Sequence, residues 1–373
     1  MDDGLTLEGV TAEIERQLAA RGDYREKVRR TVASYPLVAF YGCGAILDSI
    51  VETWDEQVGR RIDLCCDSDP SKWGREFAGG IRCVSPDELR SIKERCAVFV
   101  TIGQFREVFD ALVEAGFPSV NLIFKYDLVA AEFLDSRDDA ETAAELAAAR
   151  SLLADDRSRE VFDAILRRVL GEWNDPGLMP SVCDPDQYFP SDLVSLGADE
   201  AFVDVGAYDG DTVRDIVSRT GGRFERITCF ELDRLNYEAL SRNLRTMPQA
   251  DRITARNLGL WDTAADVRYS VGRSQSTIGS DGEVGHVVPL DEVLVGERVT
   301  FIKMDIEGAE PQALNGARSI ITAQRPKLAV CVYHHISHLW DIPLAIHDLD
   351  PRYRLYLRHH TTLEYETVCY ALP

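Results

Sequence analysis

The run AFVDVGAYDGDTV, residues 201–213, places the strongest constraint on the fold of this chain. Its apolar start leads into Asp204, Gly206 follows, and a helical pattern begins at Thr212. This order is typical of a buried parallel strand that ends in a tight turn and opens a helix. A glycine in such a turn lets the backbone close on a bound ligand. The run predicts one strand–turn–helix unit of an α/β sheet, with an ordinary solvated turn as the alternative.

Acidic residues in the same turn indicate the kind of ligand. Asp204, Asp209 and Asp211 would repel a phosphate, which needs bare N–H groups and a helix dipole. They would suit a ligand that carries positive charge together with hydroxyl or amine donors. S-adenosylmethionine, with its sulfonium and ammonium groups, is such a ligand, and we predict it as the cofactor.

The composition describes a folded, acidic protein with room for two domains. The chain has 373 residues, of which 45% are hydrophobic and 28% charged, and its net charge is −22. Because binding to a phosphate backbone needs clustered Lys and Arg, nucleic acid is an unfavourable partner. The longest charge-free run, 31–47, contains proline and glycine and predicts a core strand, not a membrane span. The acidic start shows no secretory pattern, so we expect a cytoplasmic protein.

The nine cysteines form no CxxC pair, and several of them lie in apolar, strand-like runs. Examples are Cys65, Cys66, Cys229 and Cys331. Buried free thiols in a reducing cytoplasm explain this usage better than disulfides or zinc. We therefore expect no metal centre.

Strands and helices alternate in the first part of the chain. Amphipathic helices are expected within 5–34, strands at 36–45, 61–70, 96–104 and 118–123, and helices at 86–95 and 104–115. Such alternation forms a parallel sheet with right-handed crossovers. Residues 1–130 are therefore predicted to hold N-terminal helices and a small Rossmann-like domain.

The ligand of this first domain stays open. Gly42-x-Gly44 lacks the third glycine of a dinucleotide fingerprint. Asp67 follows Gly44 by 23 residues, about where a ribose-binding acid would lie. A nicotinamide cofactor, a nucleotide-linked substrate and a purely structural role remain alternatives.

Residues 131–187 separate this domain from a second one, 188–373. The alanine-rich, charged composition of the separating segment predicts a helical connector, which ends near Asp175 in a proline-rich loop. Beyond it, strand patterns occur at 201–206, 226–233, 252–262, 299–308, 326–335, 353–359 and 364–372, with an inserted hairpin or loop at 265–290. Five parallel strands and two closing strands fit the seven-stranded, mostly parallel sheet of class I methyltransferases. The strand count alone also fits other doubly wound folds.

Charged residues that could bind a ligand or take part in catalysis lie at the ends of two predicted strands. Glu231 ends the second strand, 25 residues beyond Gly206, where its carboxylate can accept hydrogen bonds from both hydroxyls of a ribose. Lys303, Asp305 and Glu307 alternate along the end of a strand that the topology places beside the first one. Burial of three charges is costly unless they are compensated, so they indicate the mouth of an active site more than a solvated strand end.

Histidines gather after the fifth strand. His334, His335 and His338 lie in the run 331–343, and His347 follows. A single histidine there would usually be structural, but this density predicts that at least one of them faces the ligand.

The motifs FVDVGAYDGDT, FELD, IKMDIEGAE…LNGA, YHHISHLWDIP and TVCYAL together resemble the FkbM family of S-adenosylmethionine-dependent methyltransferases. The resemblance covers residues 188–373. It implies O-methylation of a hydroxyl on a sugar, glycan or secondary metabolite. The acceptor would be a small molecule or a glycan, and it could be nucleotide-linked.

The resemblance also implies roles for individual residues. The cofactor-binding residues would be Asp204, Gly206, Asp209, Gly210, Glu231 and Asn257, and the catalytic residues would be His334, Asp305, Glu307 and Lys303. A neutral histidine is well matched to proton transfer at neutral pH, so we expect His334 as the base and Asp305 as its orienting partner. His338 stands where the family usually has an aspartate before Leu-Trp, which predicts a different substrate if that aspartate holds substrate in relatives.

Two other functions stay open at this point. A nucleotide-sugar oxidoreductase or epimerase would use the first domain, but no Tyr-x-x-x-Lys pair occurs. A non-catalytic binding protein on a methyltransferase fold would not need polar residues at three strand ends.

Overall fold

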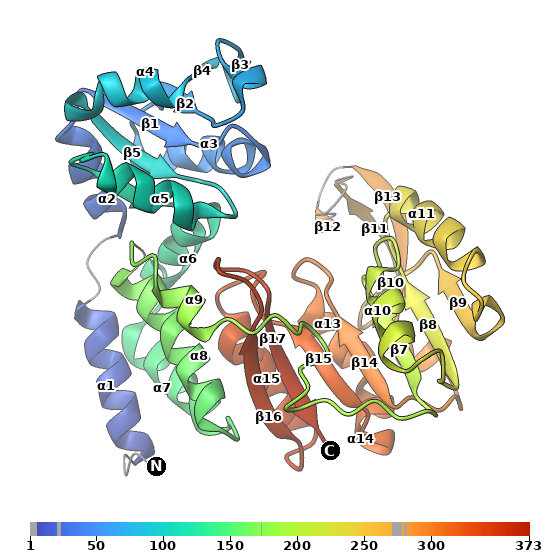
Figure 1. Ribbon diagram of the computed structural model, residues 1–373. Helices are drawn as coiled ribbons and strands as arrows, with labels where there is room; N and C mark the ends of the chain where they lie inside the picture. Colours follow the sequence, from blue (N-terminus) through green and yellow to red (C-terminus); the bar gives the residue numbers. More distant parts are fainter. Residues whose placement is uncertain (1–5, 21–23, 173, 271–277, 280–281) are drawn as a thin grey trace. The chain divides into compact units, whose positions relative to one another are not determined.

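The chain folds into two compact units, each built from separate segments (Figure 1). This computed structural model describes residues 6–20, 24–172, 174–270, 278–279 and 282–373. The N-terminal unit comprises 1–147, 162–183 and 361–364, and the C-terminal unit comprises 148–161, 184–360 and 365–373. The expected connector, 131–187, is therefore divided between the two units.

A six-stranded sheet organises the N-terminal unit, in the order β3-β4-β2-β1-β5-β6. Its strands are β1 (Leu37–Tyr41), β2 (Leu64–Cys66), β3 (Glu76–Phe77), β4 (Ile81–Val84), β5 (Cys96–Val100) and β6 (Val120–Leu122). All pairs are parallel except β3 with β4. The four predicted strands are present. The β3–β4 hairpin is an addition, because Arg82 interrupts the apolar residues of β4 and β3 has only two residues, so neither shows a recognisable apolar run.

Helices accompany this sheet. They are α1 (Leu7–Ala20), α2 (Tyr24–Ala33), α3 (Ala45–Val58), α4 (Pro86–Ser91), α5 (Phe105–Glu114), α6 (Lys125–Asp135), α7 (Asp139–Ser151), α8 (Asp156–Arg167) and α9 (Leu178–Val182), with α7 and α8 running across the unit boundary. Trp54 of α3 packs on Phe40 and Phe99, with ring centroids 4.9 and 5.1 Å apart. Each such aromatic pair adds about 0.5–1.5 kcal/mol beyond its buried area, so these contacts fix α3 on the sheet.

A seven-stranded sheet forms the C-terminal unit, in the order β16-β17-β15-β14-β7-β8-β9. The strands are β7 (Ala201–Val205), β8 (Arg226–Phe230), β9 (Ile253–Arg256), β14 (Phe301–Met304), β15 (Lys327–Cys331), β16 (Arg354–His359) and β17 (Thr367–Leu372). Only β17 runs antiparallel to its neighbours. The class I methyltransferase-type sheet is confirmed. Its strand order reverses between β7 and β14, the point at which open α/β sheets bind ligands.

The predicted third strand, 252–262, is in fact two strands. β9 joins the main sheet, whereas β10 (Gly259–Leu260) joins a four-stranded sheet with the order β10-β13-β11-β12. Asn257 turns the chain between them, because its side chain donates to the carbonyls of Glu231 and Leu232. β11 (Ala265–Tyr269) and β13 (Glu283–Val288) form the expected inserted hairpin, and β12 (Ile278–Gly279) pairs with β11. Residues 271–277 and 280–281 of this insert lie outside the described residues.

Aromatic side chains pack together in the core of the C-terminal unit. Phe189, Phe202 and Phe301 are buried, with ring centroids 5.3 to 6.0 Å apart. The helices of the unit are α10 (Asp211–Arg219), α11 (Arg234–Arg245), α12 (Leu290–Val293), α13 (Glu310–Gly316), α14 (Arg318–Gln324) and α15 (His338–Leu349). Among the described residues of the whole chain, no helix combines the length and the apolar composition that a membrane crossing requires.

Candidate active site

A cavity of about 310 Å³ opens at the carboxyl ends of β7, β8, β14 and β15. One group of lining residues follows β7 and β8 and includes Gly206, Tyr208, Asp211, Phe230, Glu231 and Asn236. The other group of lining residues lies at or after the ends of β14 and β15, or in the segments before β7 and β17. It includes Gln187, Tyr188, Lys303, Asp305, Glu307, Tyr333 and Glu366. All of these residues belong to the C-terminal unit. The cavity therefore occupies the switch point of the seven-stranded sheet.

The turn after β7 brings one backbone segment against another. Gly206 has a φ of 78°, and a Cβ at this position would lie 1.9 Å from the carbonyl oxygen of Asp305. Only glycine accommodates both this left-handed backbone and so close an approach. Lys303 Nζ donates to the Gly206 carbonyl at 2.7 Å, so the turn and the end of β14 hold each other. Gly210, with a φ of 90°, is the N-cap of α10 and does not line the cavity.

Glu231 presents a buried carboxylate to the cavity. Its two oxygens accept the backbone N–H groups of Tyr208 and Asp233, each at 2.9 Å. Burial raises the pKa of Glu231 to about 7. A carboxylate has about four lone-pair positions, so Glu231 can still accept from hydroxyl groups of a ligand. Asn257 does not line the cavity, and its contacts with the two carbonyls hold the loop after β8.

Asp204 and Lys303 form a buried ion pair beneath the cavity. Asp204 Oδ1 lies 3.1 Å from Lys303 Nζ, and their side chains are 0% and 3% exposed. Burial raises the pKa of Asp204 to about 6. Burial lowers the pKa of Lys303, but Asp204 and Asp305 outweigh it and raise that pKa above its ordinary value. Asp204 thus lies outside the cavity lining and holds Lys303 in place. Asp209 also lies outside the lining, and it pairs with Arg214 at 2.8 Å.

Asp305 is held by two tyrosine hydroxyls that the sequence did not indicate. Tyr188 donates to Asp305 Oδ2 at 2.7 Å, and Tyr333 donates to Oδ1 at 3.1 Å. Burial raises the pKa of Asp305, but Lys303, His334 and these hydroxyls together keep it below its ordinary value. Asp305 is therefore an ionised, positioned acceptor and a weak base.

His334 is enclosed by carboxylates and does not line the cavity. Its Nδ1 lies 2.9 Å from Glu310, and its Nε2 lies 3.4 Å from Asp305 and 3.6 Å from Glu307. Burial lowers the pKa of His334, but the three carboxylates raise it to about 9. The three carboxylates therefore favour the protonated form of His334, which is not a base. His334 as a neutral base stays a prediction that these surroundings disfavour, and no local sequence pattern indicated that Glu310 lies behind it.

His335, His338 and His347 also lie outside the lining of the cavity, whereas at least one of the four histidines was expected to face the ligand. His338 Nδ1 lies 3.6 Å from Glu310, and burial lowers the pKa of His338. His335 contacts the hydroxyl of Ser337 at 2.9 Å. His338 therefore supports the buried Glu310 and makes no contact with the cavity.

Asp305, Glu310 and His334 each place one possible metal-ligand atom within 4.8 Å of the others. Glu310 Oε1 already accepts the N–H of Ile306 at 2.9 Å and contacts His334 at the same distance. An ion pair accounts for this grouping without a metal ion.

Glu307 and Glu366, together with Asp305, are the carboxylates that face the second half of the cavity. Burial raises the pKa of each glutamate to about 7, and nearby Asp305 adds to the effect. Both residues have left-handed backbone, with φ of 55° and 67°, as do the lining residues Tyr188 and Tyr208. Backbone strain of this kind persists where the surrounding structure imposes it, and it concentrates at functional sites.

The structure brings together only part of the set expected from the sequence. Gly206, Glu231, Lys303, Asp305 and Glu307 meet at the cavity, whereas Asp204, Asp209, Gly210, Asn257 and His334 lie outside its lining. Sequence reasoning missed most of the other lining residues, among them Gln187, Tyr188, Tyr208, Asn236, Tyr333 and Glu366. Two of them lay in runs that the sequence singles out: Tyr208 lies in the turn after β7, and Tyr333 directly precedes His334 in a polar run at a strand end.

Comparison with known proteins agrees with this geometry. Residues 204–362 match the model of the methyltransferase FkbM domain. The structure of methyltransferase FkbM from Methylobacillus flagellatus KT is similar over 99% of this chain and 100% of that chain, with 24% identity and a TM-score of 0.78. A SAM-dependent methyltransferase from Aquifex aeolicus matches 53% of this chain and 97% of its own, with 12% identity and a TM-score of 0.30. No curated protein sequence matches the chain. The first of these structures supports the fold along the whole chain.

Proposed function

Because residues 204–362 carry a methyltransferase FkbM domain, we propose that this methyltransferase moves a methyl group from S-adenosylmethionine to a hydroxyl oxygen of its acceptor. S-adenosylmethionine is the cofactor that the FkbM family implies. When bound, it supplies an electrophilic methyl group on a positively charged sulfur. The observation that carries the O-methyl assignment is Glu307, a cavity-lining carboxylate whose pKa of about 7 suits it to take a hydroxyl proton at neutral pH.

The residues after β7 and β8 fit this cofactor. Glu231 has free lone pairs for ribose hydroxyls, and Gly206 keeps a side chain out of the turn. Glu231, Asp211 and Asp305 give the lining a negative charge, which favours sulfonium and ammonium groups. We assign Gly206 and Glu231 to cofactor binding, with Asn257 and Asp204 as residues that hold the loop and Lys303 in place.

The residues after β14 and β15 divide the work on the acceptor. Glu307 accepts the proton of the acceptor hydroxyl, which makes the oxygen a better nucleophile. Asp305, fixed by Tyr188 and Tyr333, orients the acceptor through hydrogen bonds. The imidazolium of His334 remains charged and fixes Glu310, Asp305 and Glu307 relative to one another.

The charges of the cavity restrict the acceptor. Asp305, Glu307 and Glu366 line its second half, and Lys303 is already committed to Asp204 and the Gly206 carbonyl. A neutral or cationic polyol, such as a sugar, glycan or hydroxylated secondary metabolite, donates hydrogen bonds to these carboxylates. A diphosphate would be repelled, so the acidic lining disfavours the nucleotide-linked acceptor that the resemblance allowed.

The N-terminal unit gives no support to the oxidoreductase alternative. Asp67, which lies about where a ribose-binding acid would be, accepts hydrogen bonds through Oδ2 from the Cys43 N–H at 3.0 Å and from Lys72 Nζ at 2.7 Å. Its carboxylate fastens the glycine turn after β1, so a second function is not proposed.

The test is transfer of labelled methyl from S-adenosylmethionine to a panel of neutral sugars, amino sugars and sugar phosphates. We expect a methyl ether on a neutral or amino sugar with the wild type and with Glu292→Gln, which changes an exposed residue of α12. Glu307→Gln should bind the cofactor and lose transfer. Methyl transfer to nitrogen or carboxylate, or full activity of Glu307→Gln, would overturn the proposal.

A further inference from the structure

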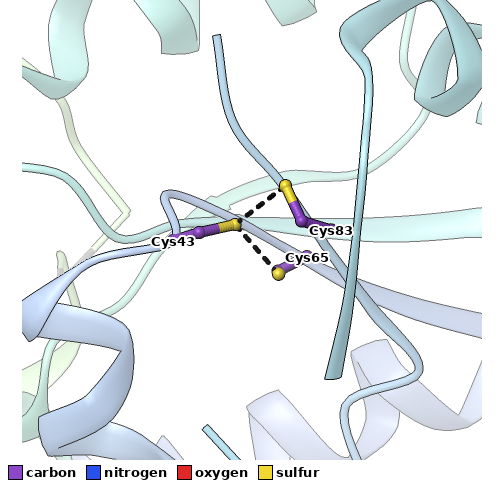
Figure 2. Close-up of side chains that lie close together, drawn as sticks. All are labelled: Cys43, Cys65 and Cys83. Carbon is purple, nitrogen blue, oxygen red and sulfur yellow. Dashed lines mark hydrogen bonds between the residues drawn. The ribbon is translucent and has the colours of Figure 1, made fainter. Parts of the chain in front are cut away.

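Three cysteines of the N-terminal unit point their sulfur atoms at one another (Figure 2). Cys43 lies in the glycine turn after β1, Cys65 lies in β2 and Cys83 lies in β4. Cys43 Sγ is 2.9 Å from Cys65 Sγ and 3.4 Å from Cys83 Sγ. All three are free thiols, and they are at most 2% exposed.

Two other buried cysteines of the same sheet do not join this group of sulfur atoms. Cys66, the neighbour of Cys65 along β2, is not part of the group, as the alternation of side chains along a strand requires. Cys96 is buried at the start of β5 and also lies outside it. In the described part of the chain, no fourth Cys, His, Asp or Glu joins the three sulfurs as a ligand.

Three sulfur donors without a fourth ligand define the class of ion. Thiolates select soft ions such as Cu(I) and Zn²⁺. Zn²⁺ takes four ligands in structural sites, whereas three sulfurs suit a trigonal soft monovalent ion. We propose that Cys43, Cys65 and Cys83 form a three-thiolate binding site for Cu(I).

The present geometry is close to what such an ion needs. Metal–sulfur bonds of about 2.3 Å place three sulfurs about 4 Å apart around a trigonal ion, so Cys43 Sγ must move away from the other two sulfurs as the ion binds. Burial raises the pKa of Cys83 to about 12, and contact with Cys65 and burial raise the pKa of Cys43. Because a thiol binds such an ion as the thiolate, binding releases protons and affinity increases with pH.

The site would be structural. An ion here ties the turn after β1 to β2 and β4, next to the turn contact in which Cys43 N–H donates to Asp67. The cavity of the C-terminal unit contains none of these cysteines, so the test needs no methyl-transfer readout and is independent of the proposed function.

The test is anaerobic titration of the full chain with Cu(I) in competition with a colorimetric Cu(I) chelator. We expect one tight equivalent in the wild type, and binding weaker by about tenfold or more in Cys83→Ala and Cys65→Ala. Cys96→Ala is the matched control, because it removes a buried cysteine of the same sheet, and it should bind as the wild type does.

A second measurement separates binding from loss of fold. Cu(I) should raise the thermal unfolding midpoint of the wild type and of Cys96→Ala, but not that of Cys83→Ala, whose far-UV circular dichroism should match the wild type. Equal Cu(I) affinity in Cys83→Ala and Cys96→Ala would overturn the assignment. Conversion of the wild type to a Cys43–Cys65 disulfide with no retained Cu(I) would overturn it as well.

Discussion

Glu307 and His334 lie 3.6 Å apart, and their surroundings affect the two side chains in different ways. Burial raises the pKa of Glu307 to about 7, whereas the carboxylates around His334 raise its pKa to about 9. These directions favour the carboxylate over the imidazole as the group that exchanges a proton at neutral pH. Residue type alone points to the histidine as base, and the carboxylates of Glu310, Asp305 and Glu307 around it favour the other assignment.

The base assignment predicts the pH dependence of methyl transfer. A base must be deprotonated, so the single-turnover rate of the wild type should rise through about pH 7, the pKa of Glu307. Glu307→Gln should lose about 10²-fold or more in rate, together with this inflection. Rapid-quench measurements from pH 5.5 to 9 would check both. A variant that keeps the inflection would assign the base elsewhere.

The buried imidazolium predicts a pH-dependent stability. The pKa of His334 is raised from 6.5 to about 9, so its contribution is complete below pH 6.5 and is lost as pH rises through about 9. Relative to His334→Gln, the wild type should gain up to about 3 kcal/mol at pH 6 and almost nothing above pH 9.5. Urea unfolding of both proteins at several pH values measures this difference. A difference that stays constant or grows with pH would contradict the ionised state.

Single residues of the site were visible in the sequence only where a strand end marks them. Gly206, Glu231 and Asp305 each follow an apolar run, so their common location follows from the topology. Gln187 and Glu366 precede strands in irregular segments, where no period indicates which way a side chain faces. The same limit applies to Cys43, Cys65 and Cys83, whose spacing matches no metal-binding motif.

At the scale of elements, the turn after β7 depends on its contact with the end of β14. Gly206→Ala would place a Cβ 1.9 Å from the Asp305 carbonyl oxygen, so β14 or the turn must move. We expect a loss of roughly 2–4 kcal/mol in unfolding free energy, and loss of cofactor binding. Gly221→Ala is the control, because Gly221 also has positive φ (58°) but no atom within 4 Å of the position that a Cβ would take. It should cost about 1–2 kcal/mol and leave binding intact.

Denaturant unfolding and calorimetry of these two variants check the prediction. Equal effects of Gly206→Ala and Gly221→Ala would show that the contact between the turn and β14 is unimportant.

Element prediction itself succeeded for long apolar runs such as β7, β8 and β14. It failed for β9 and β10, because the turn at Asn257 is held by contacts with a distant loop that no local pattern reveals.

At the scale of the whole molecule, every residue that lines the cavity belongs to the C-terminal unit. We therefore propose that the N-terminal unit serves substrate choice or assembly and takes no direct part in methyl transfer.

The unit boundaries could not be read from the sequence. Residues 148–161 lie among helix-forming residues, yet Ser158 Oγ accepts the N–H of Leu357 at 2.9 Å, and Asp155 pairs with Arg358 at 2.8 Å.

These contacts predict which fragments are stable. A fragment of residues 148–373 should be more stable than one of 162–373, because the shorter one leaves Leu357 N–H and part of the Arg358 guanidinium without partners. Each lost partner costs about 1–3 kcal/mol. Urea midpoints of the two fragments measure the difference, and both retain 162–183. Equal midpoints would show that 148–161 is dispensable for the C-terminal unit.

The most direct test of the central claim is calorimetric titration of the protein with S-adenosylmethionine. The wild type should bind one equivalent, and Glu231→Ala should bind about 1.5–3 kcal/mol more weakly, the range for hydrogen bonds to a charged group. Glu292→Ala, on the exposed side of α12, should bind as the wild type does. A wild type that does not bind S-adenosylmethionine, or an unchanged affinity in Glu231→Ala, would contradict the assignment of this cavity as the methyl-transfer site.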